Sequence, residues 1–357
     1  MGSLFKDILG SGESLFKADI SLDYSFIPKL VPYREKEQRI IASCIRPLLQ
    51  EKSGKNVFIY GQPGVGKTVA LKKVLAELEE ETDEVIPIYV SCWPHNTTFK
   101  IFTEICEQLD FKFIQNKKTE ELFKMIKQVF NKKSVVFVFD EADKLEDLDF
   151  LYTIMEEIYR KTIILITNYK EWVLNLEDRI KSRLIPEMIE FRPYNYEETK
   201  GILKQRAEYA FHPGVLSNEA FELIAKKTFE LQDIRTGLHL MKESALIAED
   251  KSSRKISLEH AQQALNKIDE FTIKSPEELE SEEKMILDLA KKNSGDKIGD
   301  LFKKYQESGG KLVYKSFQRK IERLEKSKFI TVEKTAGGDE GNTTIIKSNS
   351  ERKLTEF

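Results

Sequence analysis

Five short apolar segments, rich in β-branched and aromatic residues, alternate with helical patterns along the first half of the chain. The segments occupy residues 56–60, 85–90, 134–140, 162–168 and 188–194. Their near-continuous apolarity predicts strands buried on both faces, and the helical patterns between them, at 69–81 and 99–109, predict parallel βαβ crossovers. Residues 1–192 are therefore expected to form an α/β domain with a parallel sheet.

The strand pattern stops after Pro193, and four helical patterns follow. They are YEETKGILKQRAEYAF (196–211), SNEAFELIAKKTFE (217–230), IRTGLHLMKESALIAED (234–250) and SLEHAQQALNKI (257–268). Ser217 and Ser257 each precede a helical run with glutamate a few residues on, as helix N-caps do. We expect a small helical domain over 193–275, with the charged segment 274–283 serving as a linker.

The last part of the chain, 276–357, has a third pattern. Three amphipathic stretches (282–292, 298–308 and 314–330) precede two β-favouring arms around a glycine-rich turn. Three helices followed by a hairpin is the order of a winged helix, which is a variant of the helix-turn-helix.

Composition narrows the class of protein. The chain has 357 residues and a net charge of −3, so any affinity for nucleic acid must come from local basic patches. No apolar run approaches the roughly 18 residues of a membrane span, and the N-terminus does not read as a secretion signal. The cysteines (Cys44, Cys92 and Cys106) are odd in number and scattered, which predicts neither disulfides nor a zinc site. A cytoplasmic protein without a membrane partner is expected.

The stretch GQPGVGKT (61–68) fits the phosphate-binding pattern G-x-x-x-x-G-K-[ST] at every fixed position. Glycines let successive backbone N–H groups turn toward one point, and the helix that follows aims its positive end there. Lys67 is expected to reach the β- and γ-phosphates and Thr68 to ligate Mg²⁺. The pattern therefore predicts a site for ATP or ADP.

A pair of acids supports this prediction. Asp140 and Glu141 follow the apolar run of SVVFVFDEAD (134–143), at the end of a strand where ligands bind in open α/β sheets. Asp140 is placed to hold Mg²⁺ through water, and Glu141 to orient or activate the attacking water. The alternative is an acidic loop that only caps the next helix.

The order of these motifs, followed by TIILITN (162–168), resembles the AAA+ ATPases. The resemblance implies that Asn168 is the polar sensor beside the γ-phosphate and that Arg235, in QDIRTGLHLM (232–241), folds over the phosphates from a helical lid. It also implies that an arginine of LEDRIKSRLIPEMIEFRPY (176–194) reaches a neighbouring subunit's nucleotide, with Arg183 the best match and Arg179 second. Both arginines could instead be solvated helix residues.

The N-terminal block SLFKADISLDYSFIPKLVPYREKEQRIIASCIRPLL (14–49) resembles the archaeal origin-recognition and cell-division-control-type replication initiators. That family places Val31, Pro32, Tyr33 and Arg34 equivalents around the adenine, and Tyr194 and Arg206 match lid-proximal nucleotide contacts; a surface charge is the alternative for Arg206. The resemblance covers essentially the whole chain. It implies nucleotide contacts from Val31, Tyr33, Gly61, Gly64, Val65, Gly66, Lys67, Thr68, Val69, Tyr194, Arg206 and Arg235.

Some positions depart from the family. Val65 replaces a commonly hydroxylated residue, Gln232 stands where glycine usually precedes the sensor aspartate, and Tyr169 follows Asn168 where a small acid is frequent. None removes a catalytic atom, but together these departures indicate a divergent paralogue, for which we expect weak ATPase activity. The family's helical insertion is expected near 94–110, where an ordinary crossover helix explains the same residues.

The predicted recognition helix is basic. Residues 311–334 hold eight basic residues against three acids. Helical spacing puts Lys315, Arg319 and Arg323 on one face, whereas Phe317, Ile321 and Leu324 face the core. The expected DNA contacts are Lys315, Arg319, Lys320, Arg323 and, at the hairpin, Lys334.

Together these features predict an ATP-dependent initiator that binds duplex origin DNA at the nucleoid. The family resemblance adds other initiator paralogues and the replicative helicase as partners. A signalling or switch ATPase whose winged helix binds protein is the alternative, although such proteins normally carry a further repeat or sensor domain and none is indicated here. A clamp loader or transposition helper is a third possibility, but clamp loaders lack the terminal winged helix.

Overall fold

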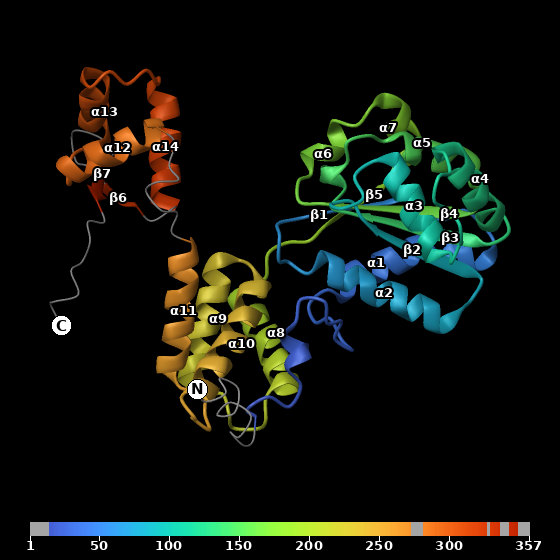
Figure 1. Cartoon of the computed structure of the whole chain (residues 1–357), viewed down its shortest axis with the longest axis horizontal. Coiled ribbons are helices and arrows are strands. Elements are labelled where there is room, and N and C mark those ends of the chain that lie inside the picture. Colours follow the sequence, from blue (N-terminus) through green and yellow to red (C-terminus); the bar gives the residue numbers. More distant parts are fainter. Residues whose placement is uncertain (1–13, 273–280, 327–328, 336–342, 349–357) are drawn as a thin grey trace, which may run out of the picture. The chain divides into compact units, whose positions relative to one another are not determined.

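A computed structural model describes residues 14–272, 281–326, 329–335 and 343–348, and the chain divides into two compact units, 1–262 and 263–357. The first unit contains a parallel five-stranded sheet and a helical bundle (Figure 1). The strands are β1 (Val57–Tyr60), β2 (Val85–Ser91), β3 (Ser134–Asp140), β4 (Lys161–Thr167) and β5 (Glu187–Glu190). Their order is β2-β3-β4-β1-β5, and every pairing is parallel, which confirms the predicted fold class.

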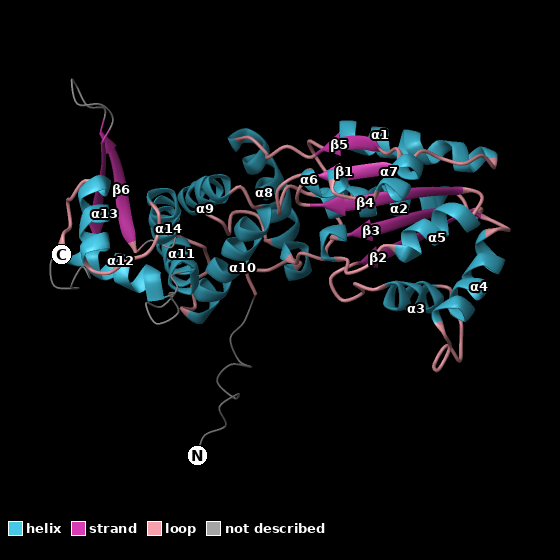
Figure 2. Ribbon diagram, turned by 90° about the horizontal axis from the view of Figure 1, so that it is seen from above, coloured by secondary structure: helices cyan, strands magenta, loops and turns pink. Residues whose placement is uncertain are grey.

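Strand residues alternate between two apolar layers, because successive side chains of a strand point to opposite faces. Phe137 and Phe139 pack in one apolar layer, whereas Val136 and Val138 pack in the other. Figure 2 shows helices on both sides of the sheet. These helices are α1 (Glu35–Ile45), α2 (Lys67–Glu81), α3 (Thr98–Gln108), α4 (Thr119–Phe130), α5 (Asp149–Glu157), α6 (Glu171–Leu174) and α7 (Asp178–Leu184).

The crossover from β2 to β3 contains two helices. The sequence analysis predicted α3, but it did not identify α4, whose apolar residues pack on the same face of the sheet. The expected insertion near 94–110 therefore coincides with α3, and a second helix follows it before the chain re-enters the sheet.

The helical bundle of the first unit contains α8 (Tyr196–Ala210), α9 (Asn218–Leu231) and α10 (Ile234–Asp250), and α11 (Leu258–Thr272) begins in this unit and continues into the second. The side chain of Ser217 accepts a hydrogen bond from the amide of Ala220, so the predicted N-cap is confirmed. The N-terminal segment packs on this bundle: the Lys17 amide donates to the Ala210 carbonyl, and η1 (Asp19–Leu22) contacts α8 and α10.

The second unit has the predicted winged-helix order. It contains α12 (Ser281–Lys292), α13 (Ile298–Glu307), α14 (Tyr314–Lys326) and the antiparallel pair β6 (Ile330–Thr335) and β7 (Thr343–Ser348). Phe317, Ile321 and Leu324 are buried in its core, as the spacing on α14 predicts. None of the helices in the described ranges is long and apolar enough to cross a membrane.

Candidate nucleotide-binding site and nucleic-acid interface

The phosphate loop joins the end of β1 to the start of α2. Gly66 precedes the helix with φ of 87°, a conformation that strains any residue with a Cβ. A Cβ there would also stand 2.6 Å from the hydroxyl oxygen of Tyr194. Backbone conformation and close packing therefore both require glycine, which explains why the motif is strict at this position.

The ammonium group of Lys67 lies inside the loop. It donates to the carbonyl oxygens of Gly61 (2.7 Å) and Gln62 (2.9 Å) and to Oδ1 of Asn168 (3.0 Å). The side chain is 7% exposed. Burial lowers the pKa of Lys67 to about 8, against the opposing effect of the nearby Asp140 carboxylate. The two positions that the sequence analysis assigned to the γ-phosphate thus meet in space.

Asp140 ends β3 and faces the beginning of α2. Its Oδ2 accepts hydrogen bonds from the Thr68 hydroxyl (2.6 Å) and from the Tyr89 hydroxyl (2.7 Å). Burial, followed by the charge of Asp140, raises the pKa of Tyr89 above its ordinary value, so this phenol remains a donor. Glu141 follows with φ of 57° and accepts from the Ser91 hydroxyl at 3.3 Å. The predicted metal ligands are therefore adjacent.

A cavity of about 470 Å³ joins these groups to the helical bundle. Its walls come from the N-terminal segment, the phosphate loop with α2, the strand ends, and α8 and α10. The lining residues are Tyr24, Ser25, Ile27, Pro28, Val31, Pro32, Pro63, Gly64, Gly66, Lys67, Thr68, Val69, Lys72, Asp140, Glu141, Asn168, Tyr194, Ile202, Gln205, Arg206, Ile234, Arg235 and Leu238.

Arg235 enters this cavity from the first turn of α10. Asp233 caps that helix by accepting from the Arg235 amide (2.9 Å), and the Arg235 Nε lies 3.2 Å from the same carboxylate oxygen. Gln232 adopts φ of 55° at the end of α9, which is the left-handed region. This conformation explains the family's glycine at that position and shows that glutamine adopts it here.

Several predicted nucleotide contacts do not line the cavity. Gly61 and Val65 lie behind the loop surface, where their carbonyl oxygens accept from Lys67 and from Arg34. Tyr33 has φ of 64°, and its hydroxyl lies against Gly201 of α8, because a Cβ on Gly201 would be 2.2 Å from it. Tyr33 is not among the residues that line the cavity, whereas Val31 is.

Arg206 makes its hydrogen bonds with the N-terminal segment of the chain. Its guanidinium donates to the carbonyl oxygens of Ser21 (3.0 Å) and Phe26 (3.2 Å) and lies over the Phe26 ring. The side chain is buried, so the surface-charge alternative is wrong. Arg206 fastens the N-terminal segment to α8 and so places Tyr24, Ser25, Ile27 and Pro28 in the cavity wall.

Sequence reasoning missed that N-terminal wall and also Lys72. Lys72 follows Thr68 by four residues on α2, so helical spacing could have found it. The wall carries no comparable signal, because it reaches the site only through tertiary contacts with residues about 180 positions away, as in the bond from Arg206 to Phe26.

Arg183 and Arg179 lie outside the cavity on the exposed side of α7. Arg183 pairs with Glu156, and Arg179 pairs with Glu177 at 2.6 Å. Both guanidinium groups stand over the ring of Tyr152. They therefore cannot act on the nucleotide of their own chain in this arrangement.

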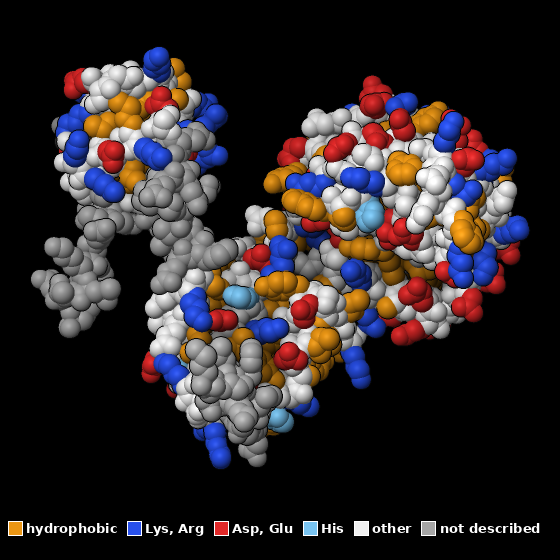
Figure 3. Space-filling model, viewed as in Figure 1, with side chains coloured by type: hydrophobic (Ala, Val, Ile, Leu, Met, Phe, Trp, Pro, Cys, Tyr) orange, Lys and Arg blue, Asp and Glu red, His pale blue; other side chains and the backbone are white. Residues whose placement is uncertain are grey.

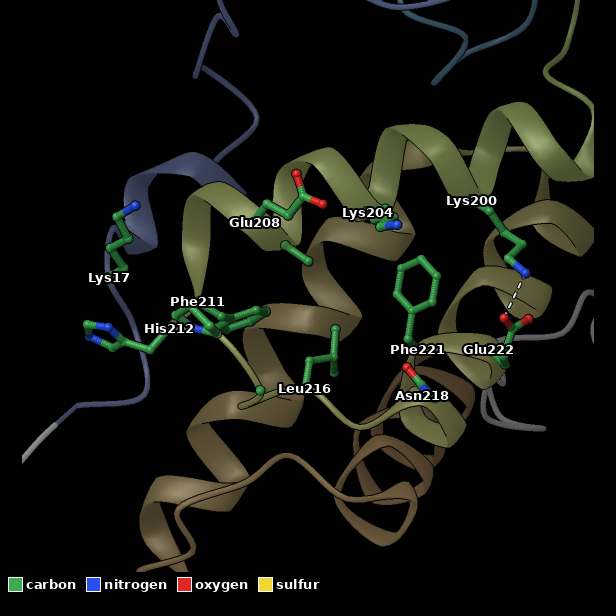
Figure 4. Close-up of a pocket in the computed structure, with 13 residues that line it drawn as sticks. Lys17, Lys200, Lys204, Glu208, Phe211, His212, Leu216, Asn218, Phe221 and Glu222 are labelled. Carbon is green, nitrogen blue, oxygen red and sulfur yellow. Dashed lines mark ion pairs between the residues drawn. The ribbon is translucent and has the colours of Figure 1, made fainter.

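A second hollow, of about 630 Å³, lies on the helical bundle and contains none of the predicted site residues (Figure 4). It is lined by apolar side chains such as Phe211 and Phe221 and by charged ones, of which Lys200 and Glu222 form an ion pair at 2.7 Å.

On α14, Lys315, Arg319 and Arg323 are exposed, and Lys and Arg side chains are spread over the face of the winged-helix unit in Figure 3. Arg323 also contacts Glu283 (3.3 Å), and Lys320 pairs with the same carboxylate at 3.0 Å with a side chain only 16% exposed. The ammonium group of Lys320 is thus already engaged in an ion pair within the protein. Lys334 belongs to β6, whereas the hairpin tip 336–342 is outside the described residues.

The chain matches two protein families along its length. Residues 50–170 match an AAA domain, and residues 200–266 match a Cdc6 AAA+ ATPase-type lid domain. The ORC1-type DNA replication protein 2 of Methanothermobacter thermautotrophicus is 31% identical over 96% of this chain and 94% of its own length. The ORC1-type DNA replication protein 1 of Archaeoglobus fulgidus is 31% identical over 80% of this chain and 73% of its own.

Solved structures agree in fold. The Aeropyrum pernix ORC1 protein in complex with DNA has a TM-score of 0.67 and 25% identity, covering 96% of this chain and 95% of its own. The A. pernix ORC2 protein, solved as ADPNP–ADP complexes, has a TM-score of 0.69 at 17% identity, covering 94% of each chain. The fold and the site define an AAA+ ATPase with a helical lid and a winged helix. Within that class, the chain belongs to the ORC1-type DNA replication protein family.

Proposed function

We propose that this protein is an ATP-dependent DNA replication initiator that binds duplex origin DNA and uses its nucleotide as a switch. The observation that carries the proposal is the cavity in which the phosphate loop, the acids after β3, Asn168 and Arg235 of the lid meet. The names of the relatives support the biological role. We propose the domain limits 1–192, 193–275 and 276–357, with the N-terminal segment packed on the lid.

ATP or ADP would lie with its phosphates on the main-chain N–H groups of the loop. Lys67 would then exchange the carbonyl oxygens of Gly61 and Gln62 for phosphate oxygens, which are better partners because they are charged. Asn168 accepts a hydrogen bond from the Lys67 ammonium group, which supports its proposed role as the γ-phosphate sensor. Arg235 would close the site from the lid.

Thr68 and Asp140 fit a magnesium ion, since they bring a hydroxyl and a carboxylate oxygen to one point and Mg²⁺ prefers oxygen ligands. When bound with ATP, Mg²⁺ neutralises phosphate charge. Glu141 is the group that would orient the attacking water. The divergence at Val65, Gln232 and Tyr169 favours slow hydrolysis, so that ATP acts mainly as a conformational clamp.

The apolar part of the cavity lining suits a purine base. Ile27, Pro28 and Val31 of the N-terminal segment line the same cavity as Ile202 and Leu238 of the lid. Apolar walls bind an aromatic ring by burying its faces. Since three of these residues precede the sheet and two belong to the lid, the base would join the two parts.

The winged helix would bind duplex DNA at the nucleoid through Lys315, Arg319 and Arg323, with Lys334 at the hairpin and a smaller part for Lys320. Basic side chains on one helical face neutralise phosphates, and arginine can also read guanine in the major groove. Other initiator paralogues and the replicative helicase are the proposed protein partners, and Arg183 would serve a neighbouring subunit's nucleotide.

Footprinting on duplex genomic fragments with ATP and with ADP tests the proposal. We expect protection of discrete sites with ATP and an altered or weaker pattern with ADP. A Lys67→Ala variant should give one pattern with both nucleotides. If no duplex is protected in either state while ATP still binds, the winged helix is a protein-binding module and the protein is a switch ATPase of another kind.

A further inference from the structure

The side chain of Arg34 is completely buried between the phosphate loop and the segment that leads to the lid. A buried guanidinium is costly unless its N–H groups are paired. Here Nε and Nη2 donate to the Val65 carbonyl oxygen at 3.1 and 3.0 Å, and Nε also lies 3.1 Å from the Tyr194 hydroxyl. Nη2 donates to the Arg192 carbonyl, and Nη1 pairs with Glu37 at 3.3 Å. Such complete pairing indicates a fixed position.

The bonds to Val65 fix the orientation of one peptide group in the phosphate loop. In a trans peptide the carbonyl and the N–H that follows it point in opposite directions. Because Arg34 holds the Val65 oxygen on the buried side of the loop, the Gly66 N–H points to the other side, where the phosphates would bind. Arg34 thus orients an anion-binding amide without touching the nucleotide.

The other contacts of Arg34 are with the connection between the sheet and the lid. This connection runs from the end of β5 at Glu190 to the start of α8 at Tyr196, and it contains Tyr194. The guanidinium carbon of Arg34 lies 4.0 Å from the centre of the Tyr194 ring. The centre of the Phe191 ring lies 5.1 Å from the same guanidinium carbon. One side chain therefore holds both the phosphate loop and the strand-to-lid connection.

We infer that Arg34 is a positioning residue that keeps the phosphate loop in its anion-binding shape and ties that shape to the base of the lid. The inference rests on the proposed nucleotide site and gives Arg34 a role behind the loop in place of one beside the adenine, since Arg34 is absent from the cavity lining. It also gives Tyr194 a second role beside its place in the cavity wall.

The test compares ATP with AMP, which lacks the β- and γ-phosphates, in the full-length chain. We expect Arg34→Lys to weaken ATP binding about tenfold and AMP binding less than about twofold, because one ammonium group cannot hold both the Val65 carbonyl and Tyr194. Arg160→Lys is the matched control: Arg160 also binds a carboxylate and a carbonyl, those of Glu51 and Lys132, but lies away from the cavity.

Equal losses for ATP and AMP would mean that Arg34 is only structural, and no loss would also overturn the inference. A wild-type protein that binds ATP no better than AMP would instead overturn the nucleotide site. If Arg34→Lys does not fold, amide hydrogen exchange on the wild type without and with ATP decides. Because the Gly66 N–H points into the cavity, its exchange should slow at least about tenfold when ATP binds, whereas an unchanged rate in protein that binds ATP would refute the inference.

Discussion

Lys67 shows how a single side chain links the sequence motif to the site. Its ammonium group is bound to two loop carbonyls and to Asn168, which comes from another strand end. The internal bonds hold the lysine over the position where phosphate would bind. In the proposed function, nucleotide binding at this residue would be an exchange of hydrogen-bond partners, and its strength would depend on the positive charge.

Replacing Lys67 with alanine should weaken ATP binding by about 100-fold or more, because hydrogen bonds to charged groups contribute about 1.5–3 kcal/mol each. Isothermal titration calorimetry measures the change. Lys73→Ala is the control, since Lys73 lies on the same helix, pairs with Glu77 at 3.2 Å and does not line the cavity. Equal affinities for wild type and Lys67→Ala would refute the phosphate site.

The lowered pKa of Lys67 predicts a pH dependence. Above the pKa of about 8, nucleotide-free Lys67 is neutral, whereas phosphate favours its charged form. Apparent ATP affinity should therefore fall as pH rises above 8, by up to about tenfold per unit, until the higher pKa of the bound lysine is reached. Titrations in EDTA at pH 7 to 10 measure this fall. Lys67→Arg stays charged and should show a flatter profile; a flat wild-type profile would contradict the prediction.

At the scale of elements, α14 has an apolar face and a basic face. Its apolar residues complete the core of the winged-helix unit, while Lys315, Arg319 and Arg323 remain at the surface. Lys320 is held by Glu283 of α12. Helical periodicity separates the buried face from the basic one, but it does not reveal that one of the basic residues is engaged by a neighbouring helix.

Arg319→Ala combined with Arg323→Ala should weaken duplex binding and lower the slope of log affinity against log salt by about 2, because each lost phosphate contact removes about 0.9. Fluorescence anisotropy across a salt series measures both quantities. Arg160→Ala with Lys251→Ala removes the same charge from the first unit and should leave the slope unchanged. An unaltered slope in the α14 variant would show that another surface binds the DNA.

At the scale of the whole molecule, the site is assembled from distant parts of the chain. The cavity is lined by the phosphate loop, by the strand-end residues Asp140, Glu141 and Asn168, and by residues of the N-terminal segment and the lid. Arg183 is absent from this assembly and pairs with Glu156 on the surface. Its proposed role therefore requires a second subunit.

Arg183→Ala should leave ATP affinity of the single chain unchanged and lower hydrolysis by the DNA-bound assembly by at least about 100-fold, in line with other arginines supplied in trans. Phosphate release with and without duplex DNA measures the effect. The control Arg179→Ala changes the adjacent, second-matching arginine. Full activity of the Arg183 variant on DNA would show that Arg183 is not the arginine supplied in trans. Arg179 would then be the candidate for that role.

Much of this molecule follows from local pattern. Buried strands, the glycine-containing loop and the helix faces each depend on short-range periodicity or backbone conformation, so the five strands and the phosphate loop were predictable. Helix α4 was not identified although it is amphipathic, and its packing beside α3 became evident only in the fold. The assignment of Tyr33 and Arg34 to the adenine came from resemblance, and the structure places neither in the cavity lining.

The chain's own sequence determined the fold class, the order of the elements and the positions of the glycine-containing loop and the strand-end acids, because the spacing of a motif within one loop or strand end survives in the folded protein. Only the tertiary structure decided which residues close the cavity, that Arg206 binds the N-terminal segment, and that Arg34 supports the loop from behind. These roles arise from contacts across about 30 to 185 residues, such as Arg34 with Val65 and Arg206 with Ser21, and the direction of a buried side chain over such separations depends on packing that no local pattern records.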